Sequence, residues 1–168
     1  MTTQYERTYS SLRRYADLTQ AAIIDHLGRT GLSGHLYELV KDYPARGGKG
    51  LRPALLIATC QAYGRPAEEA LPAAVSLEMM HNAFLIHDDV EDDSKVRRGR
   101  PTLHEMHGVG LAINAGDTLA QVALEPIRRA GNFGIRQKNA LLSELRLVVR
   151  QATEGQALEL AWRRFQRS

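Results

Sequence analysis

The chain has 168 residues, of which 43% are hydrophobic and 24% are charged, and its formal net charge is +3. This length and balance are typical of a globular protein with a substantial core, so we expect one domain over residues 1–168. No run approaches the ~20 apolar residues that a membrane span needs, and the polar start of the chain does not resemble a signal peptide.

The cysteine content and the basic residues exclude two further classes. A single cysteine, Cys60, excludes an internal disulfide framework and favours a reducing compartment, so we expect a cytoplasmic protein. The small excess of Lys and Arg is not interleaved with aromatic side chains, and no nucleic-acid motif accompanies it. We therefore expect no nucleic-acid partner.

Apolar residues recur every three or four positions along most of the chain, which is the period of an α-helix. This pattern predicts six helices, over residues 4–28, 33–43, 51–63, 67–93, 109–130 and 135–165. Gly28 and Gly31 should end the first helix, and Pro44 should stop the second. Residues 94–103 read as a charged connection, and no segment has a convincing strand pattern. The sequence therefore predicts an all-α fold.

Five of the six residues from 88 to 93 are acidic, and they lie at the C-terminal end of the fourth predicted helix. The helix dipole is negative there, so the carboxylates need cations. Asp88 and Asp92 are four apart and share one face, where carboxylate oxygens suit Mg²⁺ bound together with substrate phosphates. The acidic run alone is equally compatible with a helix end neutralised by the neighbouring basic residues Lys95, Arg97, Arg98 and Arg100.

His81 lies on the same helix, seven residues before Asp88. At 100° per residue, His81, Asp88 and Asp92 fall within ~40° of one another. A lone histidine on such a helix is most often a satisfied core residue, but the alignment with two carboxylates favours a role in a site. His87 points elsewhere, and we assign it no role.

Two groups of basic residues could bind anions. Lys49 and Arg52 flank a glycine-rich turn at the start of the third predicted helix, where backbone amides and a helix N-terminus favour an anion. The segment does not match the Walker A pattern. Arg97 and Arg98 follow the acidic run, so they either balance its charge or share a polyanionic ligand with the metal, and both can hold together.

The segment His104-Glu105-Met106-His107 resembles a zinc-binding HExxH motif. Its histidines are three residues apart rather than four, so they do not share a helix face in the way that the motif requires. We therefore do not expect a zinc protease-type site here.

On the last predicted helix, Gln156 and Glu159 are three residues apart, and Glu159 lies on an otherwise apolar stripe. Glu159 either extends its carboxylate to water from the edge of that stripe or contributes to a site. We favour the site, with Gln156 beside it.

Five segments in this order resemble the trans-isoprenyl diphosphate synthases of the polyprenyl synthetase family, of the geranylgeranyl and farnesyl type. The segments are residues 47–53, 81–92, 97–102, 114–117 and 155–159. The resemblance implies the helical bundle of the isoprenoid synthase fold. It also implies an enzyme, a Mg²⁺-dependent prenyltransferase that condenses isopentenyl diphosphate with an allylic diphosphate.

The resemblance also implies roles for individual residues. Asp88 and Asp92 would hold Mg²⁺ on the allylic diphosphate, and Arg97 would help to bind that diphosphate as part of the catalytic set. Four residues would bind the diphosphate of isopentenyl diphosphate: Lys49, Arg52, His81 and Arg98. Gln156 would lie near the waters on the metal.

The resemblance places two residues, Ala83 and Phe84, toward the floor of the tunnel that holds the growing product. One helical turn rises ~5.4 Å, which is close to one isoprene unit, so side-chain size at these positions matters. Phe84 would favour a short or medium product, from farnesyl to geranylgeranyl diphosphate.

The resemblance covers only the N-terminal part of the family's fold. Members carry a Lys-Thr pair and a second aspartate-rich motif, which nothing after Trp162 resembles. We therefore expect a fold truncated before that motif, and a homo-oligomer or hetero-oligomer with a prenyl synthase chain. The alternative is a non-catalytic regulatory subunit that binds diphosphates or tunes product length. A class I terpene cyclase ranks below both, because it does not need the Lys49 and Arg52 loop.

Overall fold

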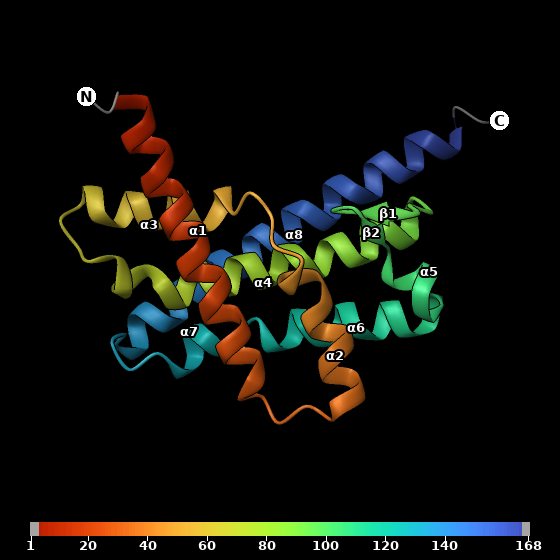
Figure 1. Ribbon diagram of the computed structural model, residues 1–168, viewed down its shortest axis with the longest axis horizontal. Coiled ribbons are helices and arrows are strands. Elements are labelled where there is room, and N and C mark those ends of the chain that lie inside the picture. The colour runs from red at the N-terminus through yellow and green to blue at the C-terminus, as the bar shows by residue number, and fades with distance from the viewer. Residues whose placement is uncertain (1–3, 166–168) are drawn as a thin grey trace. The chain divides into compact units, whose positions relative to one another are not determined.

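The computed structural model describes residues 4–165, and within them it is built from eight α-helices and one two-stranded ribbon (Figure 1). The helices are α1 (Gln4–Gly28), α2 (Gly34–Ala45), α3 (Leu51–Ala62), α4 (Ala67–Glu91), α5 (Leu103–His107), α6 (Val109–Val122), α7 (Glu125–Arg129) and α8 (Ile135–Phe165). The strands are β1 (Val96–Arg97) and β2 (Arg100–Pro101). The all-α fold class is confirmed. Among the described helices, none is both long and apolar enough to cross a membrane.

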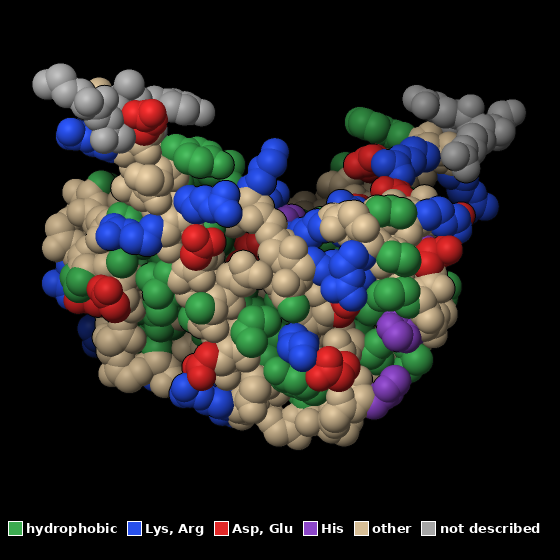
Figure 2. Space-filling model, viewed as in Figure 1, with side chains coloured by type: hydrophobic (Ala, Val, Ile, Leu, Met, Phe, Trp, Pro, Cys, Tyr) green, Lys and Arg blue, Asp and Glu red, His purple; other side chains and the backbone are tan. Residues whose placement is uncertain are grey.

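The chain divides into two compact units, Met1–Ala130 and Gly131–Ser168. In the first unit, α4 packs against α1, α3, α6 and α7, so it is the helix on which the others assemble. Its inward side chains include the fully buried Met79 and Ile86. The described part of the second unit contains the long helix α8. Lys and Arg side chains are interspersed with Asp and Glu on the face shown in Figure 2.

The predicted core of the first helix is largely confirmed. Tyr15, Ile23 and Leu27 are buried on α1, whereas Leu12 is only half-buried and packs at the edge of a cluster that α1 forms with α3 and α4. The loop before α3 approaches α1 closely at Gly50, which has a φ of 54°. A Cβ on Gly50 would lie 2.5 Å from the Cβ of Ala16, so only glycine fits this position.

The prediction that Pro44 stops the second helix was wrong, because Pro44 lies inside α2. A proline removes its own N–H donor and its ring crowds the carbonyl group one turn earlier, which strains or kinks a helix without always ending it. Here the helical hydrogen bonding continues past it, with Arg46 N donating to the carbonyl oxygen of Asp42 at 3.1 Å and Gly47 N to that of Pro44 at 3.2 Å.

The helix predicted over residues 109–130 is divided into α6 and α7. Pro126 lies in the first turn of α7. In a continuous helix it would lack its N–H donor and would collide with the carbonyl group of Val122, so the chain turns between the two helices.

The segment predicted as a charged connection contains structure that the sequence pattern did not indicate. Val96 pairs with Pro101 and Arg97 with Arg100 in an antiparallel ribbon, and α5 follows directly. The two turn residues, Arg98 and Gly99, both have positive φ values, 52° and 75°. This combination matches the hairpin turn that favours right-handed strand twist. Strands of two residues are too short to produce an alternating pattern in the sequence.

Candidate active site

The C-terminal half of α4 carries the predicted stripe of one imidazole and two carboxylates. His81 and Asp88 are half-buried, and Asp92 is exposed. Asp92 caps the helix, and its backbone N–H donates to the carbonyl oxygen of Asp88 at 2.9 Å. The two carboxylates therefore lie one helical turn apart at the negative end of the dipole, as the spacing predicted.

Asp89 is fully buried next to these residues, although the sequence analysis gave it no role. Its carboxylate accepts a hydrogen bond from the hydroxyl group of Tyr43 and two from Arg97, with Nε 3.0 Å and Nη2 2.5 Å from Oδ1. Burial and the bond to Asp89 raise the pKa of Tyr43, so its phenol stays a donor. The buried carboxylate of Asp89 thus holds the guanidinium group of Arg97 in place.

Arg97 also faces the first carboxylate of the stripe, with Nη2 3.4 Å from Oδ2 of Asp88. Burial raises the pKa of Asp88, and the neighbouring charge of Asp92 adds to this, while Arg97 opposes it. The donor set fits Mg²⁺: two hard carboxylates one turn apart repel each other, and a divalent cation between them would relieve both that repulsion and the cost of burying Asp88.

A second, cationic cluster surrounds His81, which lies two helical turns before Asp88 on α4. Arg52, in the first turn of α3, has Nη1 3.3 Å from Nε2 of His81. The guanidinium group of Arg98 packs under Gly48, where a Cβ would lie 2.8 Å from Nη2. Lys49 is exposed in the same loop. The structure therefore brings Arg52, His81 and Arg98 together beside the loop that holds Lys49.

The charges in this cluster act on His81. Burial lowers the pKa of His81 to about 4, and the positive charges of Arg52, Arg98 and Arg97 add to the effect. The imidazole is therefore neutral at pH 7 and can donate one hydrogen bond. The arrangement of guanidinium groups around it favours a polyanion.

Arg98 is held in place by polar groups that the sequence analysis did not single out as site residues. Its Nη1 donates to the backbone oxygen of Tyr43 at 3.0 Å and to Oδ1 of Asn82 at 3.3 Å. Asn82 is buried and anchored to the backbone oxygen of Glu78 at 2.8 Å. Asn82 could have been predicted as a site residue from the sequence, because it directly follows His81 on the helix that faces the glycine-rich loop.

Arg46 fixes the ribbon that carries Arg97 and Arg98. Its guanidinium group donates to the backbone oxygens of Arg97 at 3.0 Å and Pro101 at 2.8 Å, and it pairs with Asp42 at 2.6 Å. The ribbon is therefore tied to the end of α2. Arg46 belongs to the glycine-rich segment in the sequence, but its carbonyl partners lie about fifty residues away and are not visible there.

The remaining predicted residues lie elsewhere. Ala83 is fully buried on α4, and Phe84 is half-buried one turn before Asp88. Gln156 lies on α8, in the second compact unit. His87, which had no predicted role, contacts α6, with Nε2 3.3 Å from Oδ1 of Asp117.

The sequence of the chain matches a known family over most of its length. Residues 33–168 match the family described as Polyprenyl synthetase. A geranylgeranyl diphosphate synthase of Methanosarcina mazei is 38% identical over 139 residues, which cover 83% of this chain and 43% of that protein. A heterodimeric geranylgeranyl pyrophosphate synthase large subunit of Arabidopsis thaliana is 40% identical over 97 residues, which cover 56% of this chain and 26% of that protein.

The fold is also similar to that of solved structures. A geranylgeranyl pyrophosphate synthetase from Pyrococcus horikoshii aligns with a TM-score of 0.88 and 32% identity, over 96% of this chain and 49% of that one. The chain thus spans less than half the length of these relatives. The likeness confirms the helical bundle that the motifs predicted.

Proposed function

The chain belongs to the polyprenyl synthetase family, and on that premise we propose that it is a prenyltransferase subunit that condenses isopentenyl diphosphate with an allylic diphosphate. The observation that carries this proposal is the pair of adjacent clusters on α4. The carboxylates of Asp88 and Asp92 lie at the end of the helix, and the cationic cluster around His81 lies two turns before Asp88. Two diphosphates, one bound through a metal and one bound directly, match these two clusters.

We assign the cationic cluster to isopentenyl diphosphate. Arg52 and Arg98 supply guanidinium groups that suit phosphate oxygens, and His81 supplies a neutral N–H donor. Lys49 is exposed on the glycine-rich loop, so its flexible side chain can reach a ligand beside that loop.

We assign the allylic diphosphate to the end of α4, where Arg97 faces Asp88. Bound Mg²⁺, held by Asp88 and Asp92, would neutralise the diphosphate as the leaving group. Arg97 would stabilise the charge that develops on the same group.

The reaction that these groups would support is an ionisation followed by an addition. The allylic carbon–oxygen bond breaks and its electron pair leaves with diphosphate, while cationic side chains stabilise that negative charge. The alkene of isopentenyl diphosphate then attacks the allylic cation, and the released diphosphate accepts the proton that is lost. An apolar side chain on the same face of α4 as Asp88, such as Phe84, would help to keep water from the cation.

We propose that product length is set on the same helix. Phe84 lies one turn before Asp88, so its ring would limit how far a growing chain extends along α4. A short or medium product, such as geranylgeranyl diphosphate, is consistent with a large side chain at this position and with Ala83 beside it.

We also propose that the active unit is an assembly with another prenyl synthase chain, identical or different. The described residues contain one aspartate-rich pair on α4, and α8 carries a stripe of apolar residues at helical spacing. A relative is named as the large subunit of a heterodimeric synthase, and this supports the proposal. Analytical ultracentrifugation tests this proposal, and a purified chain that stays monomeric at micromolar concentration would contradict it.

Calorimetry of the whole chain tests the ligand assignments without requiring turnover. We expect a non-hydrolysable analogue of geranyl diphosphate to bind only with Mg²⁺, and Asp88→Ala to abolish this binding. Asp25→Ala, an exposed carboxylate on α1, is the matched control and should bind as the wild type does.

Two outcomes separate the possibilities. Equal binding by Asp88→Ala, or equal binding without Mg²⁺, contradicts the assignment of the end of α4. Mg²⁺-dependent binding without incorporation of labelled isopentenyl diphosphate, even when a synthase chain is added, identifies a non-catalytic diphosphate-binding subunit instead of an enzyme.

A further inference from the structure

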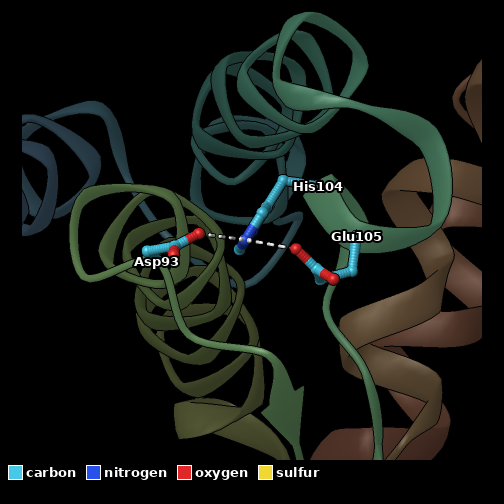
Figure 3. Close-up of side chains that lie close together, drawn as sticks. All are labelled: Asp93, His104 and Glu105. Atoms are coloured by element: carbon cyan, nitrogen blue, oxygen red, sulfur yellow. Dashed lines mark ion pairs between the residues drawn. The ribbon is translucent and has the colours of Figure 1, made fainter.

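Three side chains of metal-ligating types meet between the end of α4 and α5. Asp93 follows the end of α4, and His104 and Glu105 lie on α5 (Figure 3). Nε2 of His104 is 3.8 Å from Oδ1 of Asp93 and 3.6 Å from Oε1 of Glu105. The three ligand atoms lie within 4.8 Å of one another, so one ion could contact all three.

His104 is the buried member of this group, and its hydrogen-bonding groups are unsatisfied. Its side chain is only 6% exposed, and neither ring nitrogen has a hydrogen-bond partner among the described residues. Figure 3 shows the imidazole directed between the two carboxylates. A buried polar atom without a partner is unfavourable, so this orientation needs a compensating ligand. An imidazole nitrogen that faces two anions suits a cation that accepts its lone pair.

The two distances that involve His104 are close to those between the ligand atoms of a small transition-metal ion. Tetrahedral zinc with bonds of about 2.0–2.2 Å places its ligand atoms roughly 3.3–3.5 Å apart. The observed distances of 3.6 and 3.8 Å exceed this by a few tenths of an ångström. The Asp93 and Glu105 side chains are 76% and 37% exposed, so they have room to close that gap. Three protein ligands leave a fourth position for water.

A cation already bridges the two carboxylates. Nζ of Lys95 lies 2.8 Å from Oδ1 of Asp93 and 2.9 Å from Oε1 of Glu105. An ammonium group balances one negative charge and leaves the imidazole of His104 without a partner. The Lys95 side chain is 60% exposed and its aliphatic part is flexible. A divalent ion can therefore displace the ammonium group into water.

We propose that Asp93, His104 and Glu105 form a binding site for a zinc-type divalent cation, which displaces Lys95. The site is separate from the Asp88 and Asp92 pair and does not use the HExxH spacing, because His107 is exposed and not part of it. A bound ion would link the end of α4 to α5 across the base of the ribbon. It would therefore stabilise the segment that presents Arg97 and Arg98.

Cobalt spectroscopy of the whole chain tests this site, because tetrahedral Co²⁺ absorbs visible light and zinc displaces it. We expect one Co²⁺ per chain with tetrahedral absorption that Zn²⁺ abolishes. Glu105→Gln should weaken binding by at least about tenfold, since even residues that only support metal ligands cost that much when changed. Lys95→Met should strengthen binding, because it removes the competing ammonium group.

Two control variants fix the identity of the ligands. His107→Ala should leave the Co²⁺ spectrum unchanged, whereas His104→Ala should abolish it, with circular dichroism confirming that the variant is folded. Absence of Co²⁺ binding overturns the proposal, as does a spectrum that Glu105→Gln leaves intact. Loss of the spectrum in Asp88→Ala but not in Glu105→Gln also overturns it, because the ion would then lie at the end of α4.

Discussion

The buried carboxylate of Asp89 and the partly buried guanidinium group of Arg97 form an ion pair, with Nη2 2.5 Å from Oδ1. Asp89 is fully buried, and the hydroxyl group of Tyr43 donates to its second oxygen. Because the same Nη2 atom lies 3.4 Å from Asp88, this ion pair fixes the direction in which Arg97 points. A residue inside the core thus orients a residue of the proposed diphosphate site.

Replacing Asp89 with asparagine should destabilise the protein. Asparagine carries no charge, so Arg97 would lose its strongest ion pair; because Arg97 is 29% exposed and also faces Asp88, we expect a cost of about 1–3 kcal/mol. We expect the urea midpoint of Asp89→Asn to fall accordingly. Asp92→Asn, three residues later and exposed, is the matched control and should change stability by only about 0.5 kcal/mol. Equal midpoints for the two variants would show that this ion pair does not stabilise the fold.

The contrast between Asp88 and Asp89 shows which parts of the site the sequence could predict. Asp88 and Asp92 follow from helical spacing alone, since residues four apart share a face. The role of Asp89 depends on Tyr43, 46 residues earlier, whose hydroxyl group reaches it only after α2 has packed beside α4. Spacing within one helix carries no information about such a partner.

The fold shows the same division. The glycine positions and the length of the apolar pattern predicted the ends of α1 and α3 to within one residue. The ribbon was missed because Arg98 adopts a positive φ, which a non-glycine residue does only when its surroundings compensate. Here the side chain of Arg98 hydrogen-bonds to the backbone oxygen of Tyr43 and to Asn82, and these contacts exist only in the folded chain.

The stability of the protein should depend on pH through His81. The pKa of His81 is about 4 in the folded chain and has an ordinary value of 6.5 when the chain is unfolded. Between these two pH values the unfolded chain binds more protons than the folded chain. The contribution of the neutral His81 to stability is therefore complete above pH 6.5 and is lost as the pH falls toward 4. We expect the urea midpoint of the wild type to fall between pH 7 and pH 5.

Two variants isolate the contribution of His81 to this pH dependence. His81→Gln should lose a measurable part of the fall in midpoint, because glutamine does not titrate. His107→Gln, at an exposed position on α5, should keep the dependence of the wild type. A His81→Gln profile that superimposes on the wild-type profile would contradict the burial of a neutral imidazole.

The contact between α4 and α6 should not tolerate a methyl group at Gly116. A Cβ at this position would collide with the imidazole ring of His87, which is held by Asp117. We expect Gly116→Ala to lower the free energy of unfolding by about 1–3 kcal/mol, as overpacking does. Gly110→Ala on the same helix meets no atom within 4 Å and should be neutral or stabilising, because alanine favours a helix. Thermal unfolding that is the same for both variants would contradict this close packing.

The length of the product should respond to the side chain at position 84. Phe84 is half-buried one turn before Asp88, so without its ring a growing chain could extend to the next turn of α4, about 5.4 Å further and close to one isoprene unit. We expect Phe84→Ala, in the active assembly, to shift the products toward longer chains when they are separated by chromatography. Leu85→Ala is the matched control, because its side chain is displaced by 100° around the helix and should leave the distribution unchanged. If both variants give the wild-type products, the growing chain does not extend along this face of α4.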